Sequence, residues 1–191
     1  MADYNVPIET GDVLLYRGSL SPLSLGIRVA TWSPWTHAGL ALAVEVEGRW
    51  RRLVVDATGR GVGVRPLSQD VADGNRIAVL KRPLVPEPAD ATRRFREWAW
   101  THWSRRTPYW TRGLLVNLWT EIAGASNRPD PPDAPRRYIC SQLVSYCLRA
   151  FWGFDPCPGY PDAVTTPADL ARSNRLTLAT DRLEIVEGER A

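Results

Sequence analysis

Five short runs rich in aliphatic and β-branched residues fill the first part of the chain, and they constrain its fold more than any other feature. Turn residues at 47–49 and glycines at 59, 61 and 63 separate neighbouring runs, as expected for strands joined by tight connections. Such a series favours a meander of mostly antiparallel strands. We expect these strands at residues 11–17, 36–46, 50–56, 62–67 and 76–81.

Helical spacing replaces the strand pattern after a proline-rich link at 83–88. Between residues 91 and 106 an apolar face repeats at the period of an α-helix. A threonine cap followed by proline indicates the start of another helix at 166. Beyond these, we expect helices at 22–32, 113–123 and 140–151, a proline-rich loop at 126–137, and one or two closing strands at 175–186.

This order of elements predicts an α+β fold. The length of 191 residues suits one domain that can bury a core of its own. We therefore predict a single domain over residues 1–191, in which an antiparallel sheet packs against the helix at 140–151. Residues 82–135 are expected to form a helical and loop insertion.

The composition excludes several classes of protein and partner. With 44% hydrophobic and 24% charged residues, the chain resembles an ordinary globular protein. Its net charge of +3 comes almost entirely from scattered arginines, with Lys81 the only lysine, so we expect no nucleic-acid partner. Neither a leader nor a membrane-spanning run is apparent, which predicts a cytoplasmic protein. The three cysteines form no CxxC pair, so we expect free thiols and no metal or organic cofactor.

Cys140 is the strongest candidate for a nucleophile. It stands where a polar, proline-rich loop meets an apolar helix, and a thiol at a helix N-terminus is favoured as the thiolate. Cys147 is better explained by core packing and Cys157 as a loop residue. Two histidines, His37 and His102, are available as a base near neutral pH, and His102 reads more readily as a structural residue of its helix.

Four segments together resemble a known family. They are GDVLLYRGSLSPLSLGIRVATWSPWTHAGLAL, LVVDATGRGVGVRPL, RRYICSQLVSYCLRA and TTPADLARS. In this order they are similar to the circularly permuted NlpC-type papain-like cysteine hydrolases, also described as YiiX/YebB-like. Relatives of that family include permuted bacterial amidases and, more distantly, lecithin retinol acyltransferase. The resemblance implies a papain-like fold and is weakest between residues 82 and 135.

The resemblance also implies a catalytic triad. Cys140 corresponds to the nucleophile, His37 to the base and Asp56 to the acidic residue that orients the base. Family members often carry Glu at the position of Asp56, and Gln142 replaces a frequent Glu. A hairpin turning at 47–49 would bring His37 and Asp56 together. For Asp56, a turn-forming role is the alternative.

The resemblance implies hydrolysis of an amide bond in a peptide or cell-wall fragment through an acyl-enzyme. The alternatives are an acyl-lipid or thioester hydrolase or acyltransferase, and a binding module that keeps the fold without turnover. The further candidates for substrate or oxyanion contacts are Tyr138, Tyr16, Ser141 and Trp35, with core packing as the alternative for the aromatic residues.

Overall fold

The computed structural model describes residues 3–18, 22–84, 88–110 and 135–186. Its centre is a six-stranded sheet with the strand order β5-β4-β3-β2-β6-β7, in which every neighbouring pair is antiparallel. The five expected strands are all present, which confirms the antiparallel sheet. The strands are β2 (Val13–Arg17), β3 (Trp35–Val46), β4 (Arg49–Thr58), β5 (Gly61–Pro66), β6 (Ile77–Lys81) and β7 (Thr177–Thr180).

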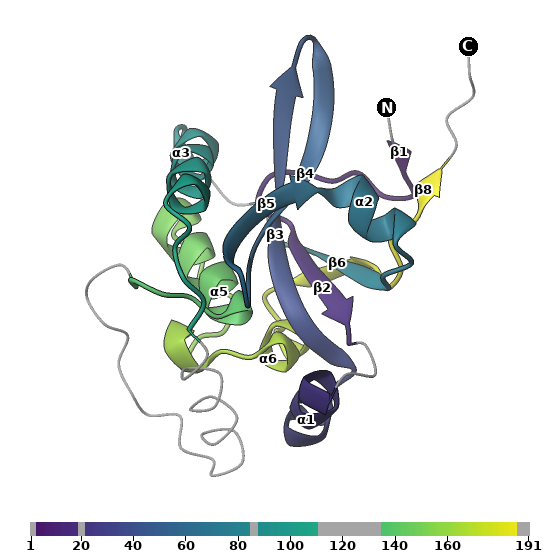
Figure 1. The fold of residues 1–191 in the computed structure, drawn as a ribbon, viewed down its shortest axis with the longest axis vertical. Helices are drawn as coiled ribbons and strands as arrows, with labels where there is room; N and C mark the ends of the chain where they lie inside the picture. Colours follow the sequence, from purple (N-terminus) through teal and green to yellow (C-terminus); the bar gives the residue numbers. More distant parts are fainter. Residues whose placement is uncertain (1–2, 19–21, 85–87, 111–134, 187–191) are drawn as a thin grey trace.

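Helices cover both faces of this sheet (Figure 1). α3, α5 and α6 pack on one face, and α2 packs on the other. The α+β prediction is therefore confirmed. The helices are α1 (Pro22–Thr31), α2 (Leu67–Ala72), α3 (Ala91–Ser104), α5 (Cys140–Trp152) and α6 (Pro167–Arg172), with a 3-10 turn at Asp162–Val164.

Some elements were not anticipated, and some predictions cannot be compared. α2 follows β5 directly at Leu67, where the sequence suggested only the end of a strand. The short strands β1 (Asp3–Tyr4) and β8 (Ile185–Val186) pair with each other and join the two ends of the described chain. The helix expected at 113–123 and most of the loop expected at 126–137 lie outside the described residues.

The helix α5 forms the centre of the main core. Leu143, Val144, Cys147 and Leu148 are completely buried against the sheet. Burying each leucine contributes roughly 1.5–3 kcal/mol, as an upper estimate. Gly153 ends the helix in the left-handed conformation, with φ of 63°, which glycine adopts without steric cost. This packing fixes the N-terminus of α5 against the strands.

Thr166 begins α6 as the sequence predicted. Its hydroxyl accepts a hydrogen bond from the backbone N–H of Asp169, and the Asp169 carboxylate accepts one from the N–H of Thr166 in return. Pro167 occupies the first turn. This reciprocal cap places α6 beside β3 and next to the start of α5.

Candidate active site

Cys140 is the first residue of α5, immediately after the extended residue Ile139. Its side chain is 5% exposed. Burial alone would raise the pKa of the thiol, but the neighbouring imidazole of His37 and the backbone N–H groups of Ala38 and Ser141 outweigh burial and lower this pKa. These contacts favour the thiolate form of the sulfur.

His37 lies on β3 between this thiol and a carboxylate. Its Nε2 is 2.7 Å from Oδ2 of Asp56, which leaves Nδ1 for the hydrogen bond with Cys140. Burial opposes the charged imidazole, but the Cys140 thiolate and the Asp56 carboxylate together raise the pKa of His37 to about 10. The three residues that the sequence singled out thus form one hydrogen-bonded series.

Asp56 reaches His37 because of the register of the predicted hairpin. In the pairing of β3 with β4, Asp56 lies opposite Gly39, so its side chain is a diagonal neighbour of His37 on the same face. A Cβ on Gly39 would lie 2.8 Å from Cγ2 of Val54 and 3.2 Å from Cβ of Asp56. Glycine at position 39 is what lets the two strands approach so closely beside the carboxylate.

Asp56 is also held by an arginine that the sequence analysis did not identify. Nη1 of Arg65 lies 2.8 Å from both carboxylate oxygens of Asp56. Asp56 is completely buried, and burial would raise its pKa, but His37 and Arg65 together lower it. Arg65 is a diagonal neighbour of Asp56 in the β4–β5 pairing. The hairpin register around residue 60 was the signal that could have found it.

The same arginine links the triad to a second carboxylate. Nε and Nη2 of Arg65 bind the two oxygens of Asp70 at 2.8 and 2.9 Å, and the hydroxyl of Tyr16 donates to Asp70 at 2.6 Å. The ring of Tyr16 lies 5.3 Å from that of His37. Ionic and hydrogen bonds therefore run from Cys140 through His37, Asp56, Arg65 and Asp70 to Tyr16.

A cavity of about 460 Å³ opens onto Cys140 and His37. Among the further candidates from the sequence, Tyr16 and Ser141 line it. The hydroxyl of Ser141 donates to the carbonyl of Thr165 at 2.6 Å, so this hydroxyl holds the start of α5 to the chain before α6. The remaining wall is contributed by residues from several elements, including Ile27, Thr31, Thr36, Thr58, Tyr109 and Thr166.

Tyr138 and Trp35 occupy other positions. Tyr138 is completely buried, and its ring packs against Trp98, His102 and Tyr146. Trp35 is half-buried against the main core. Neither residue lines the cavity at Cys140. Both side chains therefore have packing positions, which was the alternative that the sequence left open for the aromatic residues.

Tyr109 is a further aromatic residue that lines this cavity. Burial, with a smaller contribution from Cys140, raises the pKa of its phenol. The chain around it is fixed by a hydrogen bond from the N–H of Trp110 to the carbonyl of Tyr138. A neutral phenol hydroxyl is therefore available near the sulfur.

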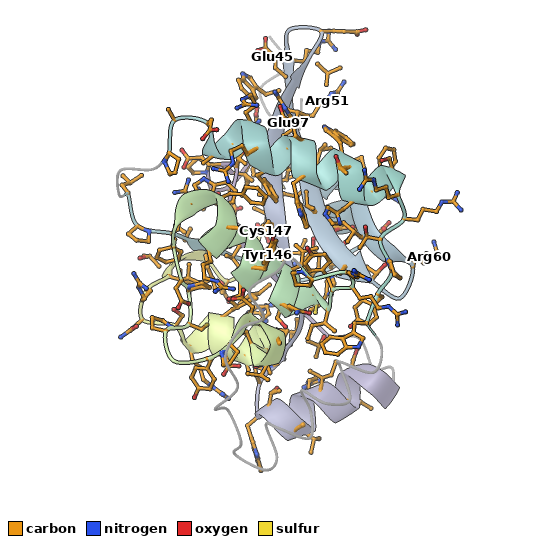
Figure 2. The ribbon with its side chains drawn as sticks, turned by 90° about the vertical axis from the view of Figure 1, so that its left-hand side faces the viewer. Glu45, Arg51, Arg60, Glu97, Tyr146 and Cys147 are labelled. Carbon is orange, nitrogen blue, oxygen red and sulfur yellow. The ribbon has the colours of Figure 1, made fainter. Side chains whose placement is uncertain are left out.

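The other two cysteines are separate from this site. Cys147 is completely buried beside Tyr146 on α5 (Figure 2), and burial raises its pKa well above the usual value. Cys157 lies in the loop after α5, and burial raises its pKa to about 12. The predicted roles of Cys147 in the core and Cys157 in a loop are confirmed.

No family model and no curated protein matches the chain. A search of solved structures finds YiiX from Escherichia coli O157:H7, described as a metalloprotein of the DUF1105 group. The superposition has a TM-score of 0.61 and 17% sequence identity, and it covers 91% of this chain and 97% of YiiX. The chain has a YiiX-like fold.

Within this YiiX-like fold, no group of three or more histidine, cysteine, aspartate or glutamate side chains is arranged to hold a metal ion, as far as residues 3–18, 22–84, 88–110 and 135–186 go. In the same part of the chain, no helix is both long and apolar enough to span a bilayer. At the site itself, the described residues bring together a thiol, an imidazole and two carboxylates joined by an arginine.

Proposed function

We propose that this protein is a cysteine hydrolase of the permuted papain-like type, in which Cys140, His37 and Asp56 form the catalytic triad. The hydrogen-bonded series from the Cys140 thiol through His37 to Asp56 supports this proposal more than any other observation. A thiolate beside an imidazolium is the resting form that nucleophilic cysteine catalysis requires. Asp56 fixes the ring and stabilises its charge.

In the proposed reaction, the Cys140 sulfur attacks the substrate carbonyl carbon, a C–S bond forms, and the carbonyl electrons move to oxygen. His37 then gives its proton to the leaving group as the carbonyl re-forms and the scissile bond breaks. Water, deprotonated by His37, attacks the thioester and releases the acid and the thiol. The N–H groups in the first turn of α5 and the hydroxyl of Tyr109 are the donors proposed for the oxyanion.

The preferred substrate bond is an amide in a peptide or cell-wall fragment. Hydrolysis or transfer of a lipid or thioester acyl group is the enzymatic alternative, and aliphatic wall residues such as Ile27 and Ile139 favour it. A binding module without turnover would not need a thiol with a lowered pKa beside an imidazole. That ion pair favours an enzyme over a scaffold.

Acylation by p-nitrophenyl acetate tests the nucleophile without knowledge of the natural substrate. We expect a burst of nitrophenolate and an acetyl group that peptide mass spectrometry locates on Cys140. The Cys140→Ala variant should show neither, whereas Cys157→Ala, which removes a thiol outside the cavity, should behave as the wild type. Acetylation confined to other residues, or an equal loss in both variants, would contradict the proposal.

A further inference from the structure

The strand β5 forms one edge of the sheet, and part of this edge has no partner strand. The N–H of Val62 points away from β4, since it donates to the carbonyl of Thr107 at 2.9 Å. Val62 opposite Ala57 is therefore a non-hydrogen-bonded pair, and so is Val64 opposite Val55, two residues along a regular register. The N–H and C=O of Val64 consequently point outward, and neither bonds to another backbone group in the described residues.

This open edge borders a second cavity, of about 1030 Å³. We call it the β5 groove and define it by Asp56, by residues 58–65 of β4, the β4–β5 turn and β5, and by Trp103, Ser104 and Arg106 at the end of α3. Its volume is at the upper end of the range usual for ligand sites. Trp103 is 48% exposed, so an indole face is available in the wall.

The groove is positively charged. Arg60 and Arg106 are exposed on its wall, and within the described residues neither forms a salt bridge. The carboxylate of Asp56 also borders the groove, but Arg65 and His37 already bind it. The two free guanidinium groups are therefore complementary to carboxylates on a ligand.

The groove also adjoins the cavity that holds Cys140. Thr58, Gly59 and Arg65 line both. A ligand bound along the second half of β5 would pass over residues 106–107, which lie against the first part of the edge, to reach the thiol. An extended ligand with its own backbone donors and acceptors suits an open strand edge better than a compact one.

We propose that the β5 groove binds an extended acidic peptide, which adds to the sheet as a strand along Val64 and places its carboxylates against Arg60 and Arg106. The identification of this peptide as substrate rests on the proposed hydrolase function, but its binding does not. The bond from Val62 to Thr107 closes the first part of the edge, so the peptide pairs with the second half of β5.

Binding is measured by fluorescence anisotropy with a short, fluorescein-labelled peptide of alternating threonine and glutamate. The protein is the Cys140→Ala variant, which cannot turn over the probe. Val64→Pro removes the outward N–H, and proline is tolerated at such an edge position. We expect it to weaken binding about tenfold, whereas Val64→Ala, which keeps the N–H, should bind as the parent does.

Charge is tested separately. The double variant Arg60→Gln/Arg106→Gln should weaken binding about tenfold and reduce its salt dependence. Arg51→Gln is the matched control, since Arg51 lies on the projecting β3–β4 hairpin, away from Arg60 at the β4–β5 turn (Figure 2). A probe with N-methylated backbone amides should bind weakly to the unaltered groove, and this measurement does not depend on the folding of any groove variant.

The proposal would be overturned by any of the following: no saturable binding of the acidic peptide, equal binding of a lysine-containing counterpart, or equal affinity for the N-methylated probe. An oligothymidylate that binds more tightly than the peptide would also overturn it and indicate a nucleic-acid site. If the peptide binds as expected but Cys140 is never acylated, the groove stands and the hydrolase proposal fails.

Discussion

One carboxylate oxygen of Asp56 is 2.7 Å from Nε2 of His37, and the same carboxylate is bound by Arg65 at 2.8 Å. A buried carboxylate that faces two cations in this way remains ionised, which is consistent with its lowered pKa. The imidazole is therefore held charged from one side by Asp56 and from the other by the Cys140 thiolate.

The pH dependence of alkylation should separate Cys140 from the other two cysteines. Only a thiolate reacts, and an ordinary cysteine has a pKa of about 8.5. Because the pKa of Cys140 is lowered, its reaction with iodoacetamide should stay fast at mildly acidic pH, while Cys147 and Cys157 react slowly. His37→Ala should move the midpoint for Cys140 upward. Peptide mass spectrometry gives the rate for each cysteine, and an ordinary midpoint unaffected by His37→Ala would remove the catalytic pair.

The charge of Asp56 should matter more for turnover than for the stability of the fold. Asp56→Asn keeps the size of the side chain but loses the charge that stabilises the imidazolium. We expect kcat for the hydrolysis of p-nitrophenyl acetate to fall by about two to four orders of magnitude. A melting temperature near that of the wild type would show that the fold persists. Unchanged turnover would limit Asp56 to a structural role in its ion pair with Arg65.

Arg65 should act as a positioning residue through Asp56. Arg65→Met leaves two carboxylates, Asp56 and Asp70, without their shared cation and should cost about 2–3 kcal/mol, less than for a fully buried pair because Arg65 is partly exposed. The pKa of Asp56 should then rise, so the acidic limb of the kcat profile should shift to higher pH. Arg65→Lys should move the acidic limb part of the way back toward its wild-type pH. A stability loss without any shift in the profile would indicate a purely structural role.

Gly39 should tolerate no side chain. In Gly39→Ala, the new Cβ meets Val54 and Asp56 at distances that force one of them to move. We expect a loss of about 1–3 kcal/mol in unfolding free energy together with reduced turnover. Gly26→Ala in α1 is the control, because a Cβ there meets nothing within 4 Å and should stabilise the helix by about 0.5–1 kcal/mol. Equal effects in urea melts would contradict the close approach at Gly39.

The Cys140–His37 ion pair should give a plateau of stability near neutral pH. Because the pKa of His37 is raised and the pKa of Cys140 is lowered, the folded pair holds one proton. The unfolded pair holds two below about pH 6.5, one up to about pH 8.5 and none above. The contribution of the pair should thus fall below about 6.5 and above about 8.5. A Cys140→Ala/His37→Ala double-mutant cycle at several pH values measures it, and a monotonic dependence across that range would refute the ion pair.

Local pattern was sufficient to locate the sheet strands, α5 and Cys140, whereas the roles of His37 and Asp56 were assigned through the family resemblance. The hairpin turn at 47–49 and the helix start at Cys140 are encoded by neighbouring residues, so they could be read without tertiary information. Arg65 and Asp70 were missed because their role depends on strand register and on α2, whose six residues carry little periodicity. Tyr138 was a candidate for the site but lies in the core. Its sequence context could not show this, since only packing decides whether an aromatic side chain faces a core or a cavity.

The position of Cys147 in the core determines what an oxidant can do to this protein. Cys140 and Cys147 are seven residues apart on one helix, which separates them by about 10 Å along its axis. A disulfide requires Cα atoms within about 7 Å. If peroxide converts the Cys140 thiolate to a sulfenic acid, Cys147 cannot rescue it as a disulfide. Without a partner cysteine on α5, continued oxidation of Cys140 would therefore proceed toward the irreversible sulfinic acid unless a small thiol reacts with the sulfenic acid first.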